Sequence, residues 1–80
     1  MTDSRIVTAA QVRAARGLLG WSQEQLATAS GVSRRTIAAI ERETHPSFES
    51  SLLAVREVME KSGVLFHSAE DRHGVTLLLR

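Results

Sequence analysis

The sequence contains no cysteine and only one proline, and none of its apolar runs is long. Without cysteine, both a disulfide framework and a thiolate metal site are excluded. No segment approaches the ~20 apolar residues that a membrane-spanning helix needs. The first ten residues, MTDSRIVTAA, have neither the basic start nor the apolar stretch of a secretory signal. We therefore expect a cytoplasmic protein with no membrane association.

The sequence also lacks a large excess of either charge, since the formal net charge is only +1. Bulk charge therefore does not by itself indicate a nucleic-acid partner. Residues 1–46 carry six arginines against four acids, whereas residues 47–80 carry three arginines and one lysine against five acids. The positive excess thus lies in the first half. A chain of 80 residues forms one small domain, which buries only roughly 60% of its unfolded surface, so dimerisation would help its stability.

Motifs of catalysis are missing as well. The sequence has no Gly-rich phosphate loop, no G-x-S-x-G and no H-E-x-x-H. We expect no enzymatic activity and no cofactor. His67 and His73 flank Glu70 and Asp71, which superficially resembles a metal cluster. Without cysteine or a helical i, i+4 spacing of ligands, we predict that this group does not bind a metal.

Two capping boxes indicate where the first two helices begin. Thr8 is followed by Gln11 and Ser22 by Gln25, each at the spacing that lets the two residues cap one another. Apolar residues then recur at helical spacing. Both runs end at a glycine, as helices commonly do, at positions 20 and 31.

Two more helices are predicted before the pattern changes. Ser33 is the expected N-cap of the third, in which Ile37 and Ile40 are buried. His45-Pro46 ends this part of the chain, because the residue before a proline avoids helical dihedral angles. Ser47 is the expected N-cap of the fourth helix, which ends near Gly63. Its apolar stripe comprises Phe48, Leu52, Val55 and Met59.

Beyond Gly63 the apolar period changes from helical spacing to two. Val64 to His67 is a short apolar run, and Val75, Leu77 and Leu79 alternate with their neighbours. We predict two strands joined by the polar segment SAEDRHG, residues 68–74. The predicted fold is therefore mainly α: a small helix-turn-helix domain of four helices (residues 1–63) with a C-terminal β-hairpin (residues 64–80).

The hairpin is also the expected dimerisation element. A strand that ends in VTLLLR leaves an unpaired edge unless something covers it. Pairing of that edge with the same edge of a second copy would give its main-chain N–H and C=O groups hydrogen-bond partners. The alternative is a hairpin that folds only onto the fourth helix of its own chain.

The break between the second and third helices has the features of a helix-turn-helix. In a helix-turn-helix, a turn of three or four residues redirects the chain sharply between two helices. Such a turn needs a residue at positive φ, which glycine adopts without a Cβ penalty. Gly31 is that residue. Ala27 lies where the two helices come closest, so that only a small side chain fits, and Val32 packs the turn into the core.

The run LGWSQEQLATASGVSRRTIAAIER, residues 19–42, resembles the helix-turn-helix of the phage Cro/repressor-type (Xre-like) DNA-binding family. The resemblance covers about residues 10–63. It includes the small, turn and anchor positions of the motif together: Ala27, Gly31, Val32, Ile37 and Ile40. The resemblance implies binding of double-stranded DNA. The family usually has a fifth helix, where we expect a strand pair.

The third helix has the chemistry of a major-groove reader. With Ile37, Ile40 and Glu41 inward, its arginines and alanines point outward. Arginine suits a bidentate contact with guanine, and alanine can touch a thymine methyl group. We predict base contacts from Arg34, Arg35, Ala38 and Ala39. The alternative is a solvated face with no ligand.

Contacts with the DNA backbone are expected at the start of two helices and at the end of one. The N-terminus of the third helix, with Ser33, suits a phosphate. The family commonly contacts a phosphate through the residue at the position of Gln23. Thr36 is expected to reach the backbone or a base. The predicted backbone contacts are Gln23, Ser33, Thr36 and Arg42.

Arg16 and Glu41 both lie on inward faces of their helices. In the resembled family these positions often form an ion pair that holds the first and third helices together, and we expect that role here rather than two separate surface charges. The structural residues are thus Arg16, Glu41, Ala27 and Gly31. Trp21 could stack on a base, but its place between two helices favours a core role.

The predicted function is a sequence-specific transcriptional regulator, a repressor or autoregulator, that binds a palindromic operator as a homodimer. A protein-binding module such as an antitoxin or anti-activator, with a second protein as its partner, is the alternative. The modest net charge and the apolar tail VTLLLR favour the alternative. The outward arginines favour DNA.

Overall fold

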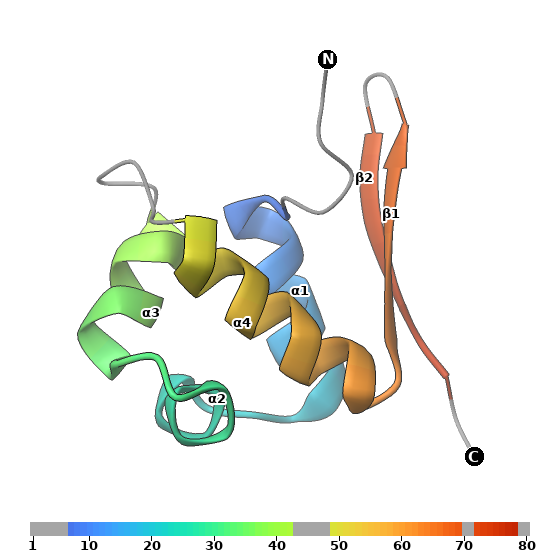
Figure 1. Ribbon diagram of the computed structural model, residues 1–80. Coiled ribbons are helices and arrows are strands. Elements are labelled where there is room, and N and C mark those ends of the chain that lie inside the picture. Colours follow the sequence, from blue (N-terminus) through green and yellow to red (C-terminus); the bar gives the residue numbers. More distant parts are fainter. Residues whose placement is uncertain (1–6, 43–48, 70–71, 79–80) are drawn as a thin grey trace.

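Four helices are followed by a two-stranded hairpin (Figure 1). A computed structural model describes residues 7–42, 49–69 and 72–78. Its elements are α1 (Ala9–Leu19), α2 (Gln23–Ser30), α3 (Arg34–Arg42), α4 (Glu49–Lys61), β1 (Val64–Ala69) and β2 (Arg72–Leu77). The expected fold class is confirmed. Ser47 and Phe48, expected at the start of the fourth helix, lie outside the described residues, as does Leu79 of the expected second strand.

Local capping sets the bounds of α1 and α2. Thr8 and Ser22 are the N-caps, and each forms a complete capping box with the glutamine three residues later. Gly20 and Gly31 end the two helices in the left-handed conformation, with φ of 70° and 76°. Glycine adopts this conformation without steric strain. The predicted starts and ends of both helices are therefore confirmed.

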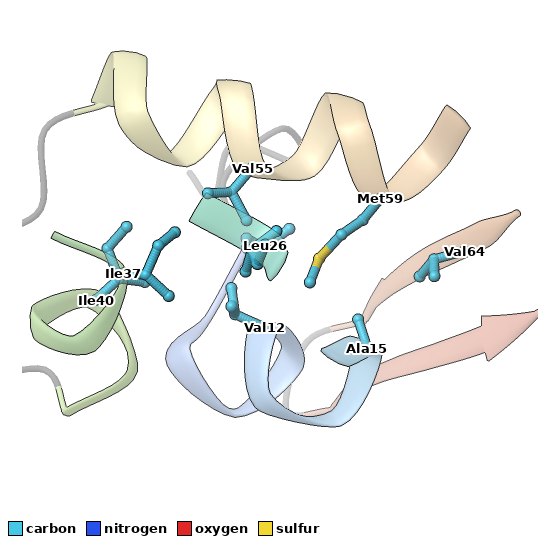
Figure 2. Packing of buried hydrophobic residues seen from close by; sticks show 9 residues of the cluster. Val12, Ala15, Leu26, Ile37, Ile40, Val55, Met59 and Val64 are labelled. Carbon is cyan, nitrogen blue, oxygen red and sulfur yellow. The ribbon is translucent and has the colours of Figure 1, made fainter. Parts of the chain in front are cut away.

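All four helices and the first strand share one core (Figure 2). Each element buries the apolar residues that recur at its own period, so the hydrophobic pattern and the fold agree. The side chains meet between α4 on one side and α1, α2 and α3 on the other. They include Val12, Ala15, Leu26, Ile37, Ile40, Val55, Met59 and Val64.

The hairpin is longer than the apolar pattern predicts. β1 and β2 pair antiparallel from Val64↔Leu77 to Ala69↔Arg72, so the expected joining segment 68–74 is wrong at both of its ends. The reason is physical: main-chain bonds form the ladder, and Ser68 and His73 can pair there without an apolar side chain. Phe66, Val75 and Leu77 pack against the core, as part of the inward hairpin face.

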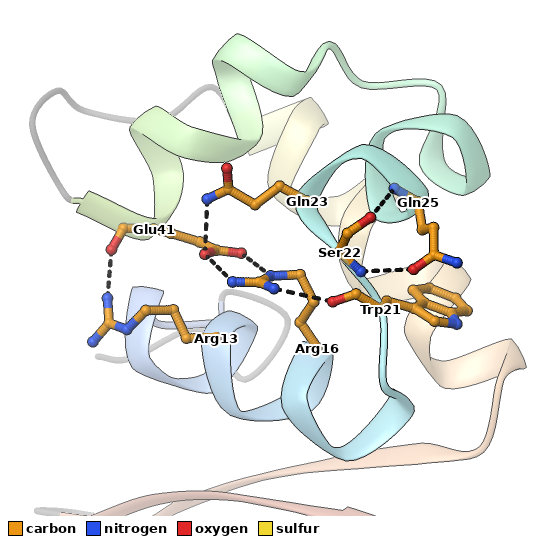
Figure 3. A network of polar contacts seen from close by, with 7 residues as sticks. All are labelled: Arg13, Arg16, Trp21, Ser22, Gln23, Gln25 and Glu41. Atoms are coloured by element: carbon orange, nitrogen blue, oxygen red, sulfur yellow. Dashed lines mark hydrogen bonds and ion pairs between the residues drawn. The ribbon is translucent and has the colours of Figure 1, made fainter.

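α1 separates the hairpin from α3. Gln11, which is 4% exposed, donates from Nε2 to the carbonyls of His67 (2.8 Å) and Gly74 (3.0 Å) on the two strands. From another side of the same helix, Arg13 and Arg16 contact α3. Figures 1 and 3 both place α3 and the hairpin on opposite sides of α1.

Candidate nucleic-acid interface

The turn between α2 and α3 is held by its own residues. The Gly31 N–H donates to the Ala27 carbonyl at 2.9 Å. The Ser30 hydroxyl accepts from the N–H of Val32 at 3.2 Å, so this serine satisfies a main-chain donor of the turn that an alanine would leave without that partner. Val32 packs against the core as expected. The turn therefore fixes the direction in which α3 leaves.

The start of α3 is capped by a hydroxyl. The Ser33 Oγ accepts from the N–H of Thr36 at 3.1 Å and donates to the Thr36 Oγ1 at 2.9 Å. By helix geometry, the N–H groups of Arg34 and Arg35 have no partner within α3. Both residues are exposed. This helix end can therefore accept an anion such as a phosphate.

One face of α3 is basic and the opposite face is buried. Ile37, Ile40 and Glu41 are buried. At 3.6 residues per turn, the far side carries Arg35, Ala38, Ala39 and Arg42, with Arg34 at its border. The three arginines are exposed, whereas the two alanines are half-buried. Because the alanines are small, another backbone can approach α3 closely between the arginines.

Among the described residues, the arginines of this face have no acidic partner. In the described parts of the chain, the ion pairs involve Arg16, Arg56 and Lys61, and none involves an arginine of the exposed α3 face. Arginine presents a planar fork of donors that fits both guanine and phosphate. The face can thus donate to base edges and to phosphate oxygens.

The expected ion pair between Arg16 and Glu41 is present and bidentate (Figure 3). Arg16 Nε lies 2.9 Å from Glu41 Oε2, and Arg16 Nη2 lies 3.0 Å from Glu41 Oε1. Arg16 Nη1 also donates to the carbonyl of Trp21 at 3.0 Å. Arg16 therefore links α1 to α3 and to the segment that precedes α2.

Both members of the pair are held in their charged forms. Burial disfavours ionisation of Glu41, but hydrogen bonds from Arg16 and Gln23 and the charges of Arg16 and Arg13 outweigh it, so the pKa of Glu41 is lowered. The hydrogen bond with Glu41 raises the pKa of Arg16. A charged pair in this position fixes geometry more reliably than it adds stability.

Gln23 and Arg13 have roles that sequence reasoning missed. Gln23 Nε2 donates to Glu41 Oε1 at 3.2 Å, so Gln23 joins the buried network. Arg13 Nη1 donates to the Glu41 main-chain carbonyl at the C-terminal end of α3, where a cation is favourable. Arg13 lies one turn before Arg16 on α1, and that spacing was the only sequence signal of its role.

Ala27 and Trp21 are both partly buried and pack against the core. The core role expected for Trp21 is therefore confirmed. His45, Glu70 and Asp71 lie outside the described residues. Within the described ranges, no three histidine, cysteine or acidic side chains are close enough to hold a metal ion. No helix among those described is long and apolar enough to cross a bilayer.

The four helices, the glycine turn and the exposed basic helix define a helix-turn-helix protein. The family profile described as "Helix-turn-helix" matches residues 12–57, more than half of the chain. This chain belongs to the Xre/Cro-like helix-turn-helix family, and it is a DNA-binding regulator of transcription. The curated proteins include no match to it.

Proposed function

We propose that the protein is a repressor or autoregulator that binds an operator with inverted half-sites as a homodimer, with α3 in the major groove. The basic face of α3 is the observation that carries the proposal. Its three exposed arginines have no ion-pair partner among the described residues, and they surround two small alanines. This arrangement allows the close approach that base readout requires.

Each side chain has an assigned role in the proposal. Base edges are contacted by Arg34, Arg35, Ala38 and Ala39. The DNA backbone is contacted by Gln23, Ser33, Thr36 and Arg42. Gln23 donates one amide hydrogen to Glu41, so its second amide hydrogen would contact a phosphate. The Ser33 hydroxyl donates to Thr36 Oγ1, so Ser33 would contact a phosphate by turning this hydroxyl away from Thr36.

A second function is favoured by a different observation. Leu65 and Leu78 of the hairpin are 43% and 52% exposed, and large exposed apolar side chains suit a protein partner. An antitoxin or anti-activator would use this surface to bind a second protein.

Salt dependence of DNA binding separates the two functions. Bound fragments are first selected from genomic DNA, and the dissociation constant is then measured over a series of salt concentrations. Each neutralised phosphate contributes about −0.9 to the log–log slope, so Arg42 on two subunits gives a slope of about −2 or steeper. A slope near zero, or no enrichment of any sequence, would overturn the proposed DNA function and leave the protein-binding module.

A further inference from the structure

The outer edge of β2 has main-chain groups with no strand partner in the described part of the chain. Among the described residues the sheet contains β1 and β2 alone, so one edge of each strand has no strand partner there. Leu78 N–H donates to the Gly63 carbonyl, at 2.8 Å, toward β1. Successive N–H groups in an antiparallel ladder point to alternate sides. Those of His73, Val75 and Leu77 therefore point toward the free edge.

Apart from Arg72 at its start, β2 lacks the features that normally prevent strand pairing. Residues 73–78, HGVTLL, include no proline and no Lys, Arg, Asp or Glu. Charged side chains and prolines are the common protection of exposed edges. Because these residues carry no formal charge, the edge can meet its own copy without repulsion between like charges.

The helical period places Leu18 on the side of α1 that faces the hairpin. It is 46% exposed and lies about 20° around α1 from Gln11, as the helical period requires for residues seven apart. Gln11 contacts both strands, and β2 packs along α1. Since Ala14, further around the helix, is exposed, Leu18 marks the border between the hairpin side of α1 and solvent.

We infer that two copies dimerise by antiparallel pairing of their β2 edges, in a four-stranded sheet that also covers Leu18. The inference rests on the proposed function for the orientation of the two copies. Antiparallel pairing of a strand with its own copy has a two-fold axis perpendicular to the sheet. The helices of both copies then stay on one face of the sheet. Because α3 lies beyond α1 on that face, both recognition helices face one side, as a single duplex requires.

Stacking of the outer hairpin faces would give the opposite orientation. These faces carry Leu65 and Leu78, so they are the competing apolar surface. A two-fold dimer formed by face-to-face stacking has its axis in the plane of the interface. The two helical layers then lie on opposite sides, and the two α3 helices point away from each other. Such a dimer cannot place both helices on one straight duplex.

The edge contact is small. A strand of six residues is about 20 Å long, and its edge buries well under the ~800 Å² per partner of a standard interface. The dimer is therefore weak in free solution and is strengthened when two copies bind neighbouring half-sites. Dimerisation must therefore be measured both in free solution and on DNA with two half-sites.

Two exposed leucines provide a matched test. Leu18→Glu and Leu65→Glu place the same charge at positions of nearly equal exposure, 46% and 43%. Both are compared with the wild-type chain by sedimentation over a concentration series, and by titration of duplexes with one or two selected half-sites. We expect Leu18→Glu to weaken dimerisation by about tenfold or more, because pairing would bury an unpaired carboxylate. It loses cooperativity on two half-sites and keeps wild-type affinity for one. Leu65→Glu behaves like the wild type.

A second pair of variants tests the edges without adding charge. Ser68 is opposite His73 in the ladder, and by the same alternation their N–H groups point to the free edges of β1 and β2. His73→Pro removes a donor from the β2 edge and is expected to weaken dimerisation, whereas Ser68→Pro is expected to leave it unchanged. Thermal melting of all four variants checks that each one folds.

Three results would overturn the edge dimer. One is the reverse pattern, in which Leu65→Glu dissociates the dimer and Leu18→Glu does not. Another is an equal loss of dimerisation in His73→Pro and Ser68→Pro when both are folded. The third is a wild-type chain that stays monomeric in solution and on two half-sites. If no salt-dependent DNA binding is found, the proposed function fails, while sedimentation of the free proteins still decides which surface is used.

Discussion

Arg35 and Arg42 lie on the same exposed face of α3 but two turns apart, so their losses should have different effects. Arg35 is at the N-terminal end, which enters the groove deepest in the proposed docking. Arg35→Ala should cost about 1–3 kcal/mol and relax the preference at one base pair per half-site. Arg42→Ala should weaken binding to all sequences about equally and flatten the salt slope by roughly one unit per subunit.

The measurement is the affinity of both variants for the operator and for each single-base change in one half-site. Uniform loss of affinity in Arg35→Ala, together with relaxed preference in Arg42→Ala, would show that α3 docks in another register. Arg34 lies at the border of the face and is expected to contact a base.

Glu41 should make the stability of the protein depend on pH. Its pKa is lower in the folded chain than the ordinary value of 4.5, so its contribution is present above that value and is lost as pH falls through the folded pKa. Glu41→Gln should destabilise the protein by about 2 kcal/mol at neutral pH. This is below the roughly 3–5 kcal/mol of a fully buried pair, because the Arg16 side chain is 25% exposed.

Urea unfolding of the wild type and Glu41→Gln at several pH values measures this difference, which should shrink as the solution is acidified. Glu57→Gln is the matched control, because the Glu57–Lys61 pair is 69% and 74% exposed and such surface pairs contribute little. A difference for Glu41→Gln that stays constant down to acidic pH would contradict the assigned pKa.

At the scale of elements, the turn before α3 depends on the backbone conformation of Gly31. A Cβ at this position would meet no heavy atom within 4 Å, but φ is +76°. Gly31→Ala should therefore cost about 1–2 kcal/mol through the left-handed conformation alone, and Gly31→Val more, since it is β-branched. Gly17, inside α1, has equally open space, and Gly17→Ala should instead stabilise the helix by about 0.5–1 kcal/mol. Thermal melting of both alanine variants measures these effects. Equal shifts of the melting temperature would show that the turn does not depend on the left-handed conformation of Gly31.

Gln11 should contribute more to the stability of the protein than Gln25, the residue in the equivalent position of α2. Both Gln11 and Gln25 close a capping box, but Gln25 is exposed, whereas Gln11 also donates to both hairpin strands. Gln11→Leu should destabilise the protein by about 1–3 kcal/mol through buried polar groups that lose their partner. Gln25→Leu should cost no more than about 1 kcal/mol. The check is urea unfolding, and equal losses would mean that Gln11 acts only as a cap.

Sequence reasoning succeeded where the interactions are local. Capping residues, helix-ending glycines and the apolar stripes act within a few positions, so their patterns can be read directly. By contrast, the hydrogen bond from Gln11 to His67 spans 56 residues, and the one from Gln23 to Glu41 spans 18. No local pattern indicates which distant acceptor a glutamine will meet. The polar end of the hairpin was missed because main-chain pairing needs no apolar side chain.

At the scale of the whole molecule, the hairpin and the recognition helix occupy opposite sides of α1. This arrangement separates the two proposed interactions: one side of the protein is available for a second copy while the other is available for DNA. The hairpin is also part of the folded core, because Val64 of β1 is fully buried in it. Removal of the hairpin would therefore unfold the protein rather than produce a folded monomer.

A two-fold dimer on one duplex should place its recognition helices about 34 Å apart, one turn of B-DNA. The most direct test is methylation interference, because guanine N7 lies in the major groove. We expect interference in two inverted clusters with centres about 10–11 base pairs apart or a multiple of that distance, with two chains bound per duplex. A single asymmetric cluster with one chain bound, or no interference at any guanine N7, would contradict major-groove reading by a pair of α3 helices.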